Sequence, residues 1–192
     1  MTNTQVAPTP SLHRYIPASL TGKTPPAPGD LTTSDLAVLW GIMKAENLVA
    51  IFFHDGSVRS LPAFIAFAEH SWLYGVRFGG AFIGFGVANM FSSSKRAAHV
   101  HLCSFRNGRL PGNSAHSPFA QAGRQWFDLL QRGGLATCIA LFPACYRTLV
   151  PWVTSFGFVE RMRLPGALHV VRGNGSVRVS DALVYERSLH AR

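Results

Sequence analysis

The sequence predicts one α+β domain in which a mixed, mainly antiparallel central sheet is flanked by helices. First, apolar residues recur at helical spacing in residues 35–46 and again in residues 118–132. Second, residues 72–78 alternate in polarity and run into Gly79-Gly80, as in an antiparallel hairpin. Third, apolar strands lie on both sides of the helix at 118–132, which indicates one parallel strand–helix–strand crossover.

Length and composition indicate a folded, rather apolar and basic protein. A chain of 192 residues suits a single core, and its 47% hydrophobic and 14% charged residues exclude a disordered protein. The net charge of +9 favours anionic partners, which include nucleic acids, phosphorylated cofactors and acidic surfaces. Because the basic residues are scattered, we expect a solvated basic surface rather than a nucleic-acid-binding stripe.

The cysteines and the start of the chain bear on localisation. Cys103, Cys138 and Cys145 are odd in number and fall in or beside apolar runs. With no secretory leader ahead of them, we expect reduced thiols in a cytoplasmic protein. The most apolar run, residues 79–91, is too short and too rich in glycine to span a membrane, so no membrane partner is expected.

The first 32 residues form a proline-rich N-terminal arm, and residues 33–192 form the single domain. Six prolines between residues 8 and 28 deny the arm helix continuation and ladder donors, so we expect it to be extended or mobile. For Tyr15 and Ile16 two alternatives stay open, namely contact with the folded domain or exposure on the arm. In the domain, Ser34 offers an N-cap for the helix at 35–46, and the run 48–53 is predicted as a first strand.

His54-Asp55-Gly56 ends that strand, and Ser60 caps a second helix with Pro62 in its first turn. Strands are then expected at 72–78 and 81–90, and another begins at Ala97. Glycines at 84 and 86 indicate a bulge or a close backbone approach. In the Ala97 strand, alternation places His99, His101 and Cys103 on one face and Val100 and Leu102 on the other.

The second half of the chain contains the crossover. Ser117-Pro118 is a helix start, and the strand at 135–142 reads as central and covered on both sides. A helix at about 146–155 follows, with Pro151 as a potential kink. Strands are predicted at 159–164 and 182–187, and a turn at residues 172–175.

The order of these elements resembles the GNAT superfamily of acyl-CoA-dependent N-acyltransferases. The segment SFGFVERMRL is similar to that family's helix end, Gly-Phe and following strand. ALFPACYRTLVPWVTSFGF and the C-terminal ALVYER also resemble family segments. The resemblance covers roughly residues 35–189 and is nearest to divergent, phage-associated members. It implies transfer of an acetyl or other acyl group from acetyl-CoA, or a related acyl-CoA, to an amine.

The resemblance also assigns the candidate site. It implies His101, with His99 as second choice, as the catalytic base. Tyr146 is the most convenient remaining proton donor, and a packing role is the alternative for it. The residues implied for cofactor binding lie on and after the Ala97 strand: Cys103, Phe105, Arg106, Arg109, Gly112, Asn113, Ser114, His116 and Ser117. A structural histidine at 101 and a buried thiol at 103 are the alternative interpretations. No cysteine and histidine spacing indicates zinc.

Several positions depart from the family pattern. The loop 109–117 lacks the Gln/Arg-x-x-Gly-x-Gly/Ala arrangement that brings backbone amides to the CoA pyrophosphate, and Pro118 removes one helix-terminal amide. The family's Asn falls at Tyr146, and its acid Tyr falls at Val153. A second hypothesis is therefore a GNAT-fold binding or assembly protein without catalysis, encoded by a phage. It predicts a cofactor slot filled by side chains or closed by the loop. A basic nucleic-acid binder ranks third.

Overall fold

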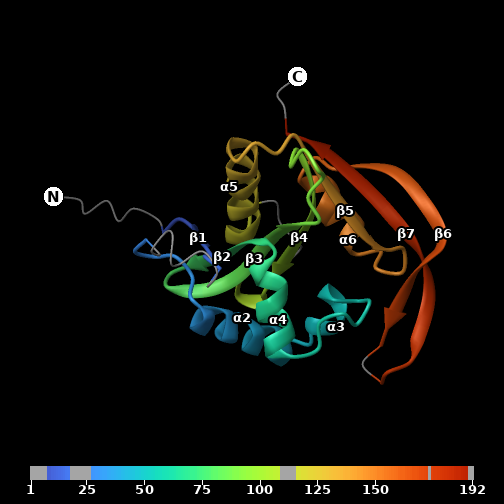
Figure 1. Ribbon diagram of the computed structural model, residues 1–192, viewed down its shortest axis with the longest axis horizontal. Helices are drawn as coiled ribbons and strands as arrows, with labels where there is room; N and C mark the ends of the chain where they lie inside the picture. Colours follow the sequence, from blue (N-terminus) through green and yellow to red (C-terminus); the bar gives the residue numbers. More distant parts are fainter. Residues whose placement is uncertain (1–7, 18–26, 109–115, 173, 190–192) are drawn as a thin grey trace.

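A computed structural model describes residues 8–17, 27–108, 116–172 and 174–189. They form a seven-stranded mixed sheet in the order β1-β2-β3-β4-β5-β7-β6, which is antiparallel except between β4 and β5. The strands are β1 (Ser11–Arg14), β2 (Trp72–Phe78), β3 (Ala81–Asn89), β4 (Ala97–Ser104), β5 (Thr137–Pro143), β6 (Val159–Val171) and β7 (Val177–Ser188). The predicted α+β class and mainly antiparallel sheet are confirmed (Figure 1).

Helices cover both faces of this sheet. One layer contains α2 (Thr33–Ala45), α3 (Val49–Phe52) and α4 (Leu61–Glu69), and the other contains α5 (Pro118–Arg132) and α6 (Leu149–Ser155). The short 3-10 helix η1 (Arg106–Gly108) follows β4. Phe64 of α4 and Phe85 of β3 belong to the core of the first layer, whereas Trp126 and Phe127 of α5 belong to that of the second. The central strands therefore contribute side chains to two separate cores.

The N-terminal segment contributes an edge strand that the sequence analysis did not predict. Residues Ser11–Arg14 pair antiparallel with β2 as β1. The next residue, Tyr15, is buried and donates its hydroxyl hydrogen to Glu69 Oε1 of α4 at 2.6 Å. The described part of the arm is thus extended and held against the domain.

The run 48–53 is a helical turn and not the predicted strand. Asn47 has a φ of 57°, and Leu48 donates its amide to Met43 O, so the chain folds back over the end of α2. Residues 49–52 then form α3. Short apolar runs do not distinguish a buried strand from a helix by periodicity, and packing against β3 and β4 decides here.

Smaller corrections concern helix starts and strand lengths. Thr32, and not Ser34, is the N-cap of α2, because Asp35 completes a capping box with it. The helix predicted from Tyr146 begins at Leu149, which places Pro151 in the first turn, where no amide donor is needed. The last two strands include the predicted segments but are longer, and Gly175 N donates to Arg172 O in the turn between them.

The predicted close approach of backbone at Gly84 is present. A Cβ at Gly84 would lie 2.3 Å from Cys103 O and 2.3 Å from Phe119 Cε2. β3 therefore lies directly against both β4 and the first turn of α5. This contact helps to position β4 and the start of α5, which together form one side of the candidate site.

Candidate active site

The sheet separates along the junction between β4 and β5. Their parallel pairing covers only Ala97–His99 of β4 and Thr137–Ile139 of β5. Beyond it, β4 continues beside β3 to Ser104, and β5 continues beside β7 to Pro143. Each strand thus follows its own neighbour, and the two facing edges diverge as a V.

A cavity of about 300 Å³, which we call the first cavity, occupies this V. Val100–Ser104 line it from β4, and Ala140–Pro143 line it from β5. Its other walls come from α3, from α6 and the residues around it, and from Ser117 at the start of α5. The cavity is mainly apolar with a few polar groups, which is the usual character of a small-molecule site.

His101 lies on β4, at the wall of the first cavity. Its ring lies 5.7 Å from the ring of Phe52 of α3, on the face that also carries Cys103, as the alternation predicted. Burial, together with the nearby charges of His99 and His54, lowers the pKa of His101 to about 4, and the charge of Asp55 opposes this shift. The imidazole is therefore neutral at physiological pH, with one ring nitrogen available as an acceptor.

Tyr146 lines the same cavity from the opposite side, in the turn after β5. Its amide donates to Pro143 O at 2.9 Å, and its carbonyl accepts from Leu149 N at the start of α6. Burial raises the pKa of the Tyr146 phenol, so the hydroxyl keeps its proton at neutral pH. The structure thus brings the two predicted catalytic residues to one cavity from different arms of the V.

The residues predicted to bind a cofactor fall into three groups. Cys103 and Ser117 line the first cavity. Phe105 is fully buried in the core beside Phe85, and the Arg106 amide donates to both carboxylate oxygens of Glu46, so neither is among the described residues that line the cavity. Arg109, Gly112, Asn113 and Ser114 lie outside the described residues.

The start of α5 points at the cavity. Ser117 is buried and accepts the Ala120 amide on its Oγ at 3.1 Å, which makes it the N-cap that the sequence predicted. His116, just before it, is exposed, and its carbonyl accepts from Gln121 Nε2. A helix N-terminus carries partial positive charge and suits an anionic group, although Pro118 offers no amide.

Sequence reasoning missed part of the cavity wall. His54 lines the cavity, and burial lowers its pKa while the neighbouring Asp55 opposes that shift. The sequence around His54 indicated only a turn, and the run before it was assigned to a strand. Leu48, Ile51 and Phe52 also line the cavity, because that run is a helical turn packed over the V. The aromatic residues around SFGF were a usable signal, since Trp152, Phe156 and Phe158 complete the wall.

Among the described residues, no group of three or more histidine, cysteine, aspartate or glutamate side chains is placed to hold a metal ion. No helix in the part of the chain that the structure describes is long and apolar enough to cross a membrane.

Comparison with known proteins was informative only at the level of structure. No protein-family model and no curated protein matches the sequence. A probable acetyltransferase of the GNAT family from Chromobacterium violaceum is 17% identical, with a TM-score of 0.63 over 83% of this chain and 80% of that chain. Neither this match nor the two described next supports the expected resemblance to a phage-associated branch of the family.

Two other solved structures hold ligands. Spermidine N-acetyltransferase from Vibrio cholerae, in complex with CoA and spermine, is 12% identical, with a TM-score of 0.67 over 94% of this chain and 96% of that chain. A putative acetyltransferase from Salmonella typhimurium with its cofactor acetyl-CoA is 12% identical, with a TM-score of 0.61 over 96% of each chain. Such identities establish a fold and not an activity. The chain has the GNAT acetyltransferase fold.

Proposed function

We propose that this protein is an N-acyltransferase that transfers an acetyl or related acyl group from acyl-CoA to an amine. The observation that carries the proposal is the first cavity, which opens where β4 and β5 diverge and is lined by both strand edges. A site of this kind accepts an extended, amide-containing chain from one side and leaves the reacting group between the strands.

The residues of the cavity fit the thioester end of acyl-CoA. The pantetheine arm carries amide groups, and no described strand pairs with the β5-facing edge of β4 beyond His99. This edge can therefore bond such an arm much as it would another strand. Ser117 at the start of α5 and Cys103 also line the first cavity, and in this proposal the arm passes them toward the phosphates. The loop 109–115 and His116 stay predicted phosphate-binding elements.

When bound, acyl-CoA supplies an activated thioester carbonyl. The amine nitrogen attacks the carbonyl carbon, a C–N bond forms and the C–S bond breaks. One proton leaves the nitrogen, and one proton is taken up by the departing thiolate. In this proposal, backbone amides on the β4 edge that faces β5 would stabilise the charge that develops on the carbonyl oxygen.

The chain's own proton-transfer groups are His101, His54 and Tyr146. His101 is neutral and can accept a proton, but a pKa of about 4 makes it a weak base. It therefore suits an amine that arrives already deprotonated. His54 lines the same cavity with a lowered pKa and is a second acceptor. Tyr146 keeps its proton and is the donor for the thiolate.

Calorimetric titration with acetyl-CoA tests the proposal, together with an assay of thiol release in the presence of amines. We expect one-to-one binding. Ala140 of β5 is buried and lines the cavity, so Ala140→Trp should block binding by filling the V. Val38→Trp introduces the same side chain at an exposed position of α2 and should bind normally. An absence of binding by the natural protein at millimolar cofactor would sink the proposal.

The second candidate is a GNAT-fold protein that binds without catalysing transfer. The low pKa of His101 and the presence of Val153 at the position of the family's acid favour it. The simplest version of this hypothesis predicts that side chains fill the cofactor slot. The cavity of about 300 Å³ that the described residues leave between β4 and β5 counts against that version. CoA binding without thiol release from acetyl-CoA, over a broad panel of amines, would favour this candidate.

A further inference from the structure

We propose that the acceptor amine carries an anionic group, a carboxylate or a phosphate, which is bound by Arg172 and Arg178 of the β6–β7 hairpin. This inference rests on the proposed function and concerns a second cavity of about 340 Å³. Ala50 and Ile51 of α3, Cys145 and Tyr146 after β5, and Val170–Arg172 and Arg178 of the hairpin line it.

The second cavity adjoins the first. Ile51 and Tyr146 line both, so a ligand in the second cavity lies next to the proposed proton donor. The first cavity also reaches Ser117 at the start of α5, on a different wall. A thioester that enters past α5 and an amine that enters past the hairpin would therefore meet in the V without competing for one entrance.

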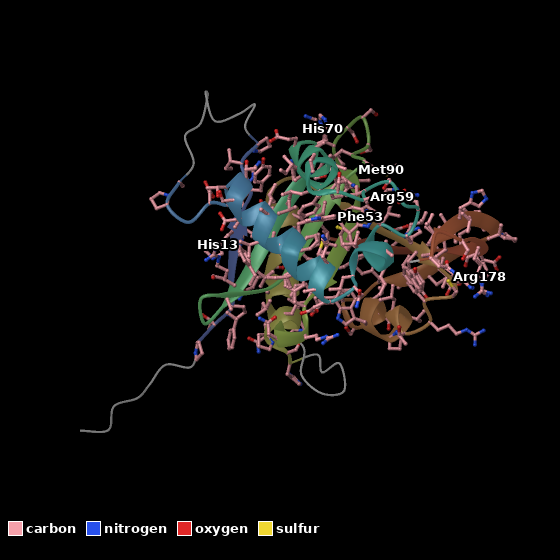
Figure 2. The ribbon with its side chains drawn as sticks, turned by 90° about the horizontal axis from the view of Figure 1, so that it is seen from below. His13, Phe53, Arg59, His70, Met90 and Arg178 are labelled. Carbon is pink, nitrogen blue, oxygen red and sulfur yellow. The ribbon has the colours of Figure 1, made fainter. Side chains whose placement is uncertain are left out.

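The hairpin end is held beside α3. Val171 N donates to His54 O at 2.7 Å, which joins the end of β6 to the loop after α3. Arg178 is opposite Val170 in the antiparallel register, so it lies next to the same end of the strand. Figure 2, in which Arg178 is labelled, shows this side chain on the hairpin, on the side of the molecule where α3 lies.

The charges around the second cavity have one sign. The described residues that line it include two arginines and no aspartate or glutamate. Neither arginine takes part in an ion pair within the described part of the chain. Arg59, whose Nε donates to Gly56 O, adds a third positive charge in the loop that Val171 contacts. Arginines with no carboxylate partner are well suited to bind a carboxylate or a phosphate.

The nearby carboxylates are all engaged elsewhere. On the hairpin, Glu160 accepts from the Tyr185 hydroxyl, Glu186 pairs with Arg161, and Asp181 pairs with Arg163. Next to His54, Asp55 accepts from the amide and the hydroxyl of Ser57. The acidic groups are thus at the base or the middle of the hairpin or in a local turn, and the arginines are at its end.

This pattern disfavours a polycation. The Vibrio cholerae neighbour was solved with spermine, a polyamine. In the present protein a diamine would bring its second positive charge toward Arg172 and Arg178, and like charges repel. An amine with an anionic far end would instead place a negative charge beside these arginines. The two arginines therefore favour such amines over diamines.

Matched amines test the inference. Butylamine, putrescine and 4-aminobutyrate each contain four carbons and end in a neutral, a cationic and an anionic group, and ethanolamine and phosphoethanolamine form the phosphate pair. With acetyl-CoA, we expect 4-aminobutyrate or phosphoethanolamine to exceed putrescine by about 10-fold or more in kcat/KM. Arg172→Gln with Arg178→Gln should remove most of this preference. Arg161→Gln, on the same hairpin but outside both cavities, should keep it.

Saturation-transfer NMR of the same amines gives a readout without turnover. The inference is supported if an anionic amine gives a signal with the natural protein and none with the double variant. The amine with the stronger signal, carboxylate or phosphate, identifies the preferred anion. Equal use of all amines, a preference for putrescine, or no binding of any amine overturns it. A failure of acetyl-CoA titration would instead overturn the proposed function, so the two failures are distinguishable.

Discussion

His101 combines a position at the cavity wall with a strongly lowered pKa, and this makes protein stability depend on pH. Its pKa falls from 6.5 to about 4 in the folded protein, so the unfolded chain binds more protons between these values. The free energy of unfolding should therefore decrease as the pH falls from 6.5 toward 4, by up to about 3 kcal/mol, and should not change with His101 above that window. Denaturant titrations at several pH values measure this slope.

His101→Gln supplies the control, because it removes the titrating group and should flatten the slope. His54 and His99 also have lowered pKa values, so part of the slope should remain. The charge of Asp55 acts in the opposite direction and limits the effect. An NMR titration in which the ring of His101 gains its proton near pH 6.5 would contradict the lowering of its pKa by burial.

Two glycines make a second prediction at the residue scale. Gly84→Ala would place a methyl group within 2.3 Å of Cys103 O and of the Phe119 ring, and backbone at that distance cannot move cheaply. We expect a destabilisation of about 3 kcal/mol. Gly41 of α2 is exposed and has nothing within 4 Å, so Gly41→Ala should stabilise by up to about 1 kcal/mol. Thermal unfolding of both variants tests the contrast, and similar melting temperatures would refute it.

Single residues were predictable when a strong local rule applied. Ser117-Pro118 marks a helix start in almost any context, and alternation in the Ala97 strand placed His101 and Cys103 on one face. His54 was not predictable, because His-Asp-Gly reads as a turn and nothing local indicates that packing directs this histidine to a cavity formed by β4 and β5.

At the scale of elements, α3 is where the sequence and the structure differ most. Leu48–Phe53 is rich in residues that favour strands, yet it does not join the sheet, and β1 is the strand that pairs with the outer edge of β2. The chain instead folds over the V, and Phe52 contacts both Phe85 and His101. Tertiary packing thus overrides the local preference.

This packing predicts a coupling between α3 and His101. Phe52 lies 5.0 Å from the Phe85 ring and 5.7 Å from the His101 ring, between centroids. Phe52→Ala should admit water to His101 and raise its pKa toward 6.5, and it should destabilise the fold by about 2 kcal/mol because the side chain is only partly buried. NMR titration of His101 measures the shift. Val38→Ala, at an exposed site of α2, should leave the pKa unchanged.

At the scale of the whole molecule, the fold was predictable because the order of most elements resembles that of the GNAT superfamily, although one predicted strand was wrong and β1 was missed. The V was harder to predict, because it results from a competition between strands. β4 stays beside β3 to Ser104, and β5 stays beside β7 to Pro143. α5 lies in the connection from the C-terminal end of β4 to the N-terminal end of β5. No single segment of the sequence carries this information.

The net charge of +9 leads to a prediction for the whole molecule, because acyl-CoA carries several phosphates and pantetheine carries none. Attraction between the protein and a polyanion weakens as salt screens it, so the affinity for CoA should fall about 10-fold between about 50 mM and 500 mM NaCl. The binding of pantetheine, which we propose to occur in the same V, should change little. Calorimetry of both ligands over this salt range separates the charge of the molecule from the shape of the cavity. Equal salt dependence would show that long-range charge does not contribute to cofactor binding, and the first cavity would then account for all of the affinity.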